Sequence, residues 1–291
     1  MADARSCVGF SSACKQAREG GGLPGYEGGL TPELFNVPRR CWLPPEIVRL
    51  IDALVRRLEH EDTLLAMNGG VLGTTLCEAA HAGGHLDVRF LLARGADVET
   101  TTVYVHPDGM ELNWSALIWA AWFGHLAVCV AILDSGATLL DFAMVNASWN
   151  GHTPVVALLL DRGADIHSWN GEALVNAAQE GHLATAKLLL DRGADVHTQH
   201  DMPLLQAAAR DHLEMVRLLL DCGADLHAED DRPLRAAAQG GHLEMARLLL
   251  DRAADIHADN EFALRVARQE GHAAVEALLL ERGALEPQDE D

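Results

Sequence analysis

From about residue 72 onward, apolar and polar positions repeat with a fixed period of 30 residues. Each period contains an alanine-rich apolar group and then a leucine-rich one, both at the i, i+3, i+4 spacing of one helix face. In the period that begins near residue 201, the first face holds Leu204, Ala207 and Ala208, and the second holds Leu213, Val216, Leu219 and Leu220. The pattern predicts two amphipathic helices in every period.

Two short markers separate these helices. A Gly-His or Asp-His pair stands at the turn inside each period, and Gly-Ala-Asp follows the second helix, where glycine permits a left-handed cap. The turn histidines at the regular spacing are His152, His182, His212, His242 and His272, and His85 and His125 stand in the same local sequence. A fixed period of this size predicts a stack of supersecondary units rather than one globular core.

We count seven units, at about 74–113, 114–139, 140–170, 171–200, 201–230, 231–260 and 261–291. The first unit carries an insertion in which 103–105 and 110–112 flank a turn at 106–109, and this pattern predicts a β-hairpin. Unit three begins early. The expected fold is an all-α solenoid of helix–turn–helix repeats, over 72–291, with a short β-hairpin insertion.

These residues carry a family resemblance. The segment 203–225, PLLQAAARDHLEMVRLLLDCGAD, resembles the ankyrin repeat, whose pattern is T-P-L-H-x-A-A-x-x-G-H, a leucine-rich helix and G-A-D. The resemblance covers about three quarters of the chain, with a period of 30 where the family usually has about 33. The short form is similar to ankyrin repeats of large amoeba-infecting viruses. The resemblance implies a non-catalytic scaffold that binds a partner protein through its concave face and finger-like turns.

Aromatic residues gather in units two to four. Trp122-Phe123 and Trp149-Asn150 fill the two positions before Gly-His, which the resemblance places on the concave surface. Exposed tryptophan in a groove is typical of a binding hot spot. The candidate partner-binding residues are Trp122, Phe123, Trp149, Trp169 at a finger tip and Tyr104 in the hairpin. The alternative is that the rings fill gaps left by the short unit three, and Trp119, beside Ala120-Ala121, is expected in the core.

The net charge excludes some classes of partner, and the spacing of the periodic polar residues excludes shared metal or catalytic sites. With 43 Asp and Glu against 22 Lys and Arg, the net charge is −21, which argues against nucleic acid or an anionic membrane as partner. Equivalent residues of stacked units lie about 10 Å apart. The periodic histidines therefore cannot share a zinc ion, which needs ligands near 2.0–2.1 Å, and the periodic aspartates cannot form a dyad. We expect no enzyme activity, no metal and no cofactor.

The N-terminal quarter is different in character. Residues 1–36 are glycine-rich and are expected to form a disordered tail. Residues 37–71 contain an amphipathic helix whose start, Leu-Pro-x-Glu-Ile, resembles the beginning of an F-box. That resemblance implies docking to the adaptor of a cullin-type ubiquitin ligase, through Leu43, Pro44, Ile47 and Leu50. The other interpretation is a helix that caps the apolar face of unit one.

The six cysteines have no pairing pattern, and the chain shows neither a secretory signal nor 18 successive apolar residues. We expect an intracellular, cytoplasmic protein (in the host cytoplasm if the chain is viral).

Overall fold

A computed structural model describes residues 72–105 and 111–285. All of them belong to the second of two compact units, Glu59–Asp291. The predictions for the tail 1–36 and the segment 37–71 lie outside the described residues.

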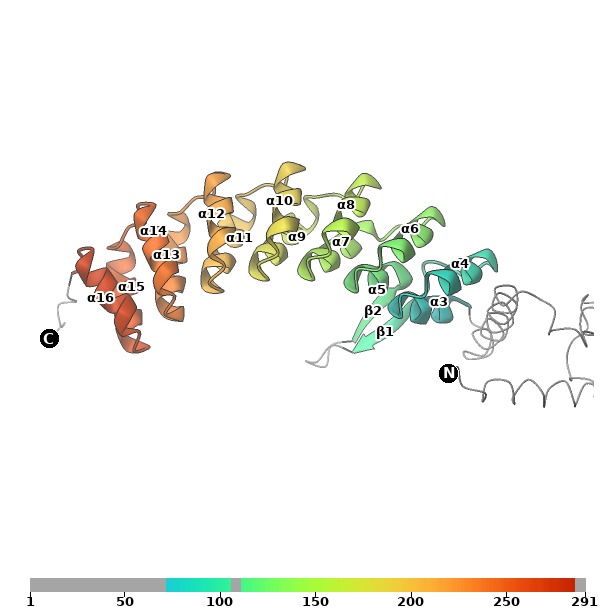
Figure 1. Ribbon diagram of the computed structural model, residues 1–291, viewed down its shortest axis with the longest axis horizontal. Helices are drawn as coiled ribbons and strands as arrows, with labels where there is room; N and C mark the ends of the chain where they lie inside the picture. The colour runs from blue at the N-terminus through green and yellow to red at the C-terminus, as the bar shows by residue number, and fades with distance from the viewer. Residues whose placement is uncertain (1–71, 106–110, 286–291) are drawn as a thin grey trace, which may run out of the picture. The chain divides into compact units, whose positions relative to one another are not determined.

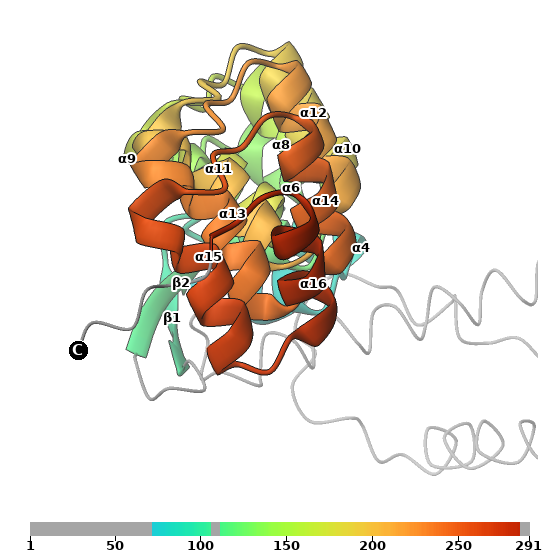
Figure 2. The same ribbon diagram turned by 90° about the vertical axis from the view of Figure 1, so that its left-hand side faces the viewer.

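The described residues form seven helix pairs and a two-stranded sheet, which confirms the expected fold. Figures 1 and 2 show the pairs in a row, with the odd-numbered helices in one layer and the even-numbered helices in the other. The pairs are α3 (Leu72–His81) with α4 (His85–Ala93), α5 (Ala116–Trp122) with α6 (Leu126–Asp134), α7 (Leu140–Trp149) with α8 (Thr153–Asp161), α9 (Ser168–Gln179) with α10 (Leu183–Asp191), α11 (Thr198–Ala209) with α12 (Leu213–Asp221), α13 (Ala228–Gly240) with α14 (Leu243–Asp251), and α15 (Ala258–Gln269) with α16 (Ala273–Glu281).

Packing follows the sequence pattern. Each helix contacts its pair partner and the same-layer helix of the next unit. The alanines of the odd layer, such as Ala120 and Ala121, are fully buried and let neighbouring helices approach closely. Leucines such as Leu159 and Leu189 fill the space between the layers. One continuous core therefore runs through the row, because no pair can bury its own apolar faces alone.

The turn histidines join each unit to its neighbour. In six consecutive units the imidazole Nε2 lies 2.9–3.2 Å from a main-chain carbonyl oxygen of the preceding unit. The six pairs are His125 with His81, His152 with Trp122, His182 with Trp149, His212 with Gln179, His242 with Ala209, and His272 with Gln239. We call these contacts the histidine ladder.

The glycine of the turn makes room for the ladder. Gly151 has a φ of +71°, and a Cβ atom there would collide with the imidazole of His182. Glycine thus supplies both the left-handed backbone and the space for the incoming ring.

The grouping of His85 with the turn histidines is wrong. Gly84, not His85, precedes helix α4, and its amide donates to the Ala79 carbonyl as the amide of His212 does to that of Ala207. His85 is therefore the first residue of α4, the position of Leu213 in α12.

The insertion is a hairpin, as expected. Strands β1 (Thr101–Val105) and β2 (Glu111–Ser115) pair antiparallel, with Thr102 opposite Trp114 and Tyr104 opposite Leu112. Strand β2 runs directly into α5. The hairpin is therefore joined directly to the first turn of α5, in the second unit.

None of the helices in the described ranges is long and apolar enough to span a membrane.

The histidine ladder should contribute to stability at each interface. We expect His212→Ala to lower the free energy of unfolding by about 1 kcal/mol, the usual net value of one hydrogen bond. Urea denaturation followed by circular dichroism measures this loss. The control is His200→Ala, because His200 is exposed and makes no hydrogen bond within the described residues. Equal stability of His212→Ala and the wild type would contradict the assignment.

Candidate protein-interaction surface

Five aromatic residues from the hairpin and α5 form one cluster. We define the aromatic cluster as Tyr104, Trp114, Trp119, Trp122 and Phe123. Ring centroids lie 4.5 Å apart for Tyr104 and Trp114, 4.7 Å for Trp114 and Trp119, and 5.2 Å for Trp114 and Trp122. Phe123 stacks parallel to Trp119 at 6.2 Å. The structure therefore brings three of the five predicted binding residues together.

Trp114 is the base of this cluster. Trp114 is only 2% exposed, and the rings of Tyr104, Trp119 and Trp122 lie against it. The indole Nε1 of Trp119 donates to the Thr102 hydroxyl at 2.9 Å, which holds β1 against α5. Contacts of this kind between aromatic rings stabilise by about 0.5–1.5 kcal/mol beyond their buried area. The hairpin and α5 thus present one connected aromatic surface.

Burial differs among the aromatic residues of the cluster. Trp122 and Tyr104 are half-buried, whereas Phe123 keeps 42% of its surface exposed. Trp119 packs against the core, as expected, but is only half-buried. His81, which the sequence analysis did not single out, adds edge contacts at 4.8 Å to the rings of Trp119 and Phe123.

The remaining two tryptophans lie apart from the cluster. Trp149 is 37% exposed and occupies in α7 the last helical position that Trp122 occupies in α5. Trp169 is 56% exposed and packs on Phe142, with ring centroids 4.9 Å apart. Trp149 therefore belongs to the unit beside the cluster, and Trp169 belongs to a finger.

Exposed apolar side chains concentrate in the same part of the row. Ten large apolar residues of the described ranges are exposed, and eight of them lie in the first four units. These eight are Leu86, Val103, Phe123, Leu126, Leu139, Trp149, Trp169 and Leu183. An uneven distribution of this kind is typical of an interaction surface.

Comparisons with known proteins agree with this architecture. The family model "Ankyrin repeats (3 copies)" matches residues 143–230 and 204–291, together more than half of the chain. The chain belongs to the ankyrin-repeat family. Among solved structures it is similar to the human ASB11 ankyrin repeat domain, with 28% identity and a TM-score of 0.62. The match covers 72% of this chain and 98% of the other. No curated protein matches the chain.

The ankyrin fingers contain a second histidine arrangement. The Nδ1 atoms of His197 and His227 lie 3.1 Å from the carboxylates of Asp201 and Asp231, four residues later. His257 contacts Glu261 at 2.6 Å in the same way. These histidine–carboxylate pairs were not among the sequence predictions. The i+4 spacing of the acidic residues was the available signal.

These three carboxylates lie inside the finger rather than at its surface. The residues Asp201, Asp231 and Glu261 are between 4% and 8% exposed. The Asp201 carboxylate also accepts the amide of Asp225 in the next finger at 2.8 Å, and Asp231 accepts that of Asp255. The carboxylates therefore link successive ankyrin fingers.

The finger backbone is strained where these carboxylates stand. In each of four fingers, three successive residues have φ between +49° and +73°, a region that non-glycine residues rarely adopt. The runs are Trp169 to Gly171, Gln199 to Asp201, Glu229 to Asp231, and Asp259 to Glu261. Conformations of this kind persist only where surrounding contacts hold them. The carboxylate bonds supply such contacts in the last three runs.

The pKa values of three of these histidines are shifted, and the direction differs between the fingers and the ladder. The hydrogen bond to Asp231 raises the pKa of His227, and that to Glu261 raises the pKa of His257. Burial instead lowers the pKa of His152, a member of the histidine ladder. Protonation therefore favours the finger contacts of His227 and His257, whereas burial favours the neutral form of His152.

Within 72–105 and 111–285, no group of three or more His, Cys, Asp or Glu side chains converges as a metal site would require. The thiols of Cys77 and Cys129 are buried, and burial raises their pKa to about 11 and about 12, so both stay protonated at neutral pH.

The finger bond should be visible in a histidine titration. Asp231→Asn keeps an oxygen acceptor for the Asp255 amide but removes the charge, so the pKa of His227 should fall back towards 6.5. Because the wild-type pKa is raised, the stabilisation is complete below pH 6.5 and is lost as the pH rises through the folded-state pKa. NMR titration of the imidazole Cε1 proton measures the shift. His257 is the internal control, since Glu261 is its partner, and an unchanged His227 would contradict the assignment.

Proposed function

We propose that this ankyrin-repeat protein is a scaffold that binds a partner protein through Phe123, Trp149 and the half-buried Trp122 and Tyr104 beside them. The observation that supports this most directly is the exposure of large aromatic side chains on a folded base. Aromatic residues dominate binding hot spots because they bury a large area and lose little conformational freedom.

The hairpin is proposed as the rim of this surface. Val103 is 59% exposed on β1, next to Tyr104 in the cluster. The bond between Trp119 and Thr102 and the ring contacts of Tyr104 fix the hairpin before a partner arrives. A pre-formed surface spends less conformational entropy on binding. Trp169, on the finger at the end of unit three, is proposed as a peripheral contact.

The scaffold proposal is tested by replacing the exposed rings. We expect Phe123→Ala with Trp149→Ala to abolish capture of partner proteins from a lysate of the source cells, measured by quantitative mass spectrometry. One hot-spot residue contributes about 2 kcal/mol, which is about 30-fold in affinity. Thermal melting should stay close to that of the wild type, because both side chains are substantially exposed.

The matched control is Gln239→Ala with Glu270→Ala. These exposed residues hold the corresponding positions in the last two units. If the control pair reduces capture as much as the aromatic pair, or if the aromatic pair lowers the melting temperature by many degrees, the proposed hot spot is wrong.

The second candidate is an F-box-like adaptor of a cullin-type ubiquitin ligase. Its support is the sequence 43–55, in which Leu43, Pro44, Ile47 and Leu50 resemble the start of an F-box. In this proposal the N-terminal segment recruits the ligase and the ankyrin array holds the target.

The adaptor proposal is tested by pull-down of the full chain with the purified ligase adaptor protein. We expect the intact chain to retain the adaptor and a Leu43→Ala, Pro44→Ala, Ile47→Ala variant to lose it, because the apolar contact is removed. The Phe123→Ala, Trp149→Ala variant is the control and should retain the adaptor. No retention by the intact chain would remove this candidate.

A further inference from the structure

The even-numbered layer is joined by a row of ion pairs. At four junctions, the arginine just after one even helix binds the last aspartate of the preceding even helix. The pairs are Arg162 with Asp134, Arg192 with Asp161, Arg252 with Asp221, and Arg282 with Asp251, with N–O distances between 2.8 and 3.1 Å. We call each of these pairs a rung.

The junction between α4 and α6 has no rung. Ser135 follows α6 in place of the arginine, and Ala93 ends α4 in place of the aspartate. The sixth residue of α6 is Ala131, whereas every later even helix has leucine there. The later residues are Leu158, Leu188, Leu218, Leu248 and Leu278. The side chains that cover the other junctions are therefore replaced by small ones.

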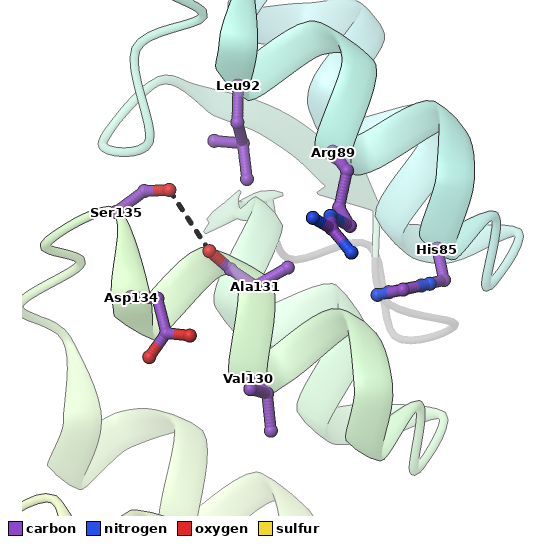
Figure 3. A pocket seen from close by; sticks show the side chains of 7 residues that line it. All are labelled: His85, Arg89, Leu92, Val130, Ala131, Asp134 and Ser135. Atoms are coloured by element: carbon purple, nitrogen blue, oxygen red, sulfur yellow. Dashed lines mark hydrogen bonds between the residues drawn. The ribbon is translucent and has the colours of Figure 1, made fainter.

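A groove of about 360 Å³ opens at this junction. Its lining is His85, Arg89 and Leu92 from α4, and Val130, Ala131, Asp134 and Ser135 from the α6 side (Figure 3). The α10–α12 junction also lacks the arginine, because Cys222 stands in its place, but it keeps Leu218. The α4–α6 junction has Ala131 at the leucine position, and Ala131 lines the groove. We attribute the open space to this smaller side chain.

The groove carries unpaired positive charge. Arg89 makes no ion pair or hydrogen bond within the described residues, and Figure 3 shows its guanidinium pointing into the space between the helices, near His85. The opposite wall is already neutralised, because Asp134 binds Arg162 at 2.9 Å and the Ser135 hydroxyl donates to the Ala131 carbonyl. In a chain of net charge −21, this cationic side chain offers a binding site for an acidic group.

We propose that this groove docks an acidic, leucine-containing segment of a partner protein. Leu92 and Ala131 offer an apolar floor for an aliphatic side chain, and Arg89 offers a bidentate donor for a carboxylate. A trough between two parallel surface helices suits an extended or helical peptide. The site lies on the even layer, whereas the aromatic cluster belongs to the odd layer and the hairpin, so it is independent of the proposed function.

The probe is a fluorescein-labelled peptide, GELEELDG, titrated with the full chain and followed by fluorescence anisotropy. Its uncharged analogue GQLQQLNG is the chemical control. We expect the analogue to bind at least about tenfold more weakly than the acidic peptide, because it lacks the charge-assisted bond to Arg89. The Phe123→Ala, Trp149→Ala variant should bind the acidic peptide as the wild type does, which separates this site from the proposed hot spot.

Two variants locate the site. Arg89→Glu should weaken peptide binding about tenfold or more, whereas Lys187→Glu, the same charge change at the corresponding position of α10, should not. Ala131→Leu should abolish binding without lowering the melting temperature, since it restores the residue of the later units. Equal losses in Arg89→Glu and Lys187→Glu, or unchanged binding by Ala131→Leu, would overturn the proposal. Full displacement of the peptide by equimolar inorganic phosphate would show a small-anion site only.

Discussion

The bond from each turn histidine to a carbonyl of the preceding unit is the contact on which the regularity of the structure depends. It fixes the distance between units at the point where the chain turns from the odd to the even layer. The alanine-rich helices can pack closely only at that distance, and the turn glycine must leave room for the ring. The finger carboxylates of Asp201 and Asp231 likewise bind the main chain of the neighbouring unit. Each unit is therefore defined by its neighbours more than by its own contacts.

The departures from this regularity fall near the N-terminal end of the described row. The hairpin, the aromatic cluster and the uncovered junction between α4 and α6 all involve the first two units. Burial separates the roles of the aromatic residues, because Trp114 forms the base while Phe123 and Trp149 remain accessible. The two layers thus differ in chemistry at this end, one being aromatic and the other cationic.

Helix pairs, turn positions and the hairpin could be predicted because they depend on local spacing, glycine and apolar periodicity. His85 was misplaced because the Gly-His dipeptide matches locally, although its distance to the Gly95-Ala96-Asp97 end is one residue shorter than in the other units. Runs of left-handed residues without glycine, such as Glu229 to Asp231, have no sequence signature. To predict the groove from the sequence, Ala131 would have to be compared with the same position in five other helices. The aromatic cluster was predicted in part, since Trp114 gained its role only through pairing across the hairpin.

The uniform bonds of the later units also bear on how such a chain changes in length. Between α11 and α16, every interface uses the same histidine, carboxylate and leucine positions at a 30-residue spacing. If one such unit were removed or duplicated, the helices brought together would have the same side chains at their interface as before. The first two units lack this property, because the hairpin and Ala131 have no counterparts elsewhere. The array could therefore gain or lose whole units among its later repeats without changing the surface that its first two units form.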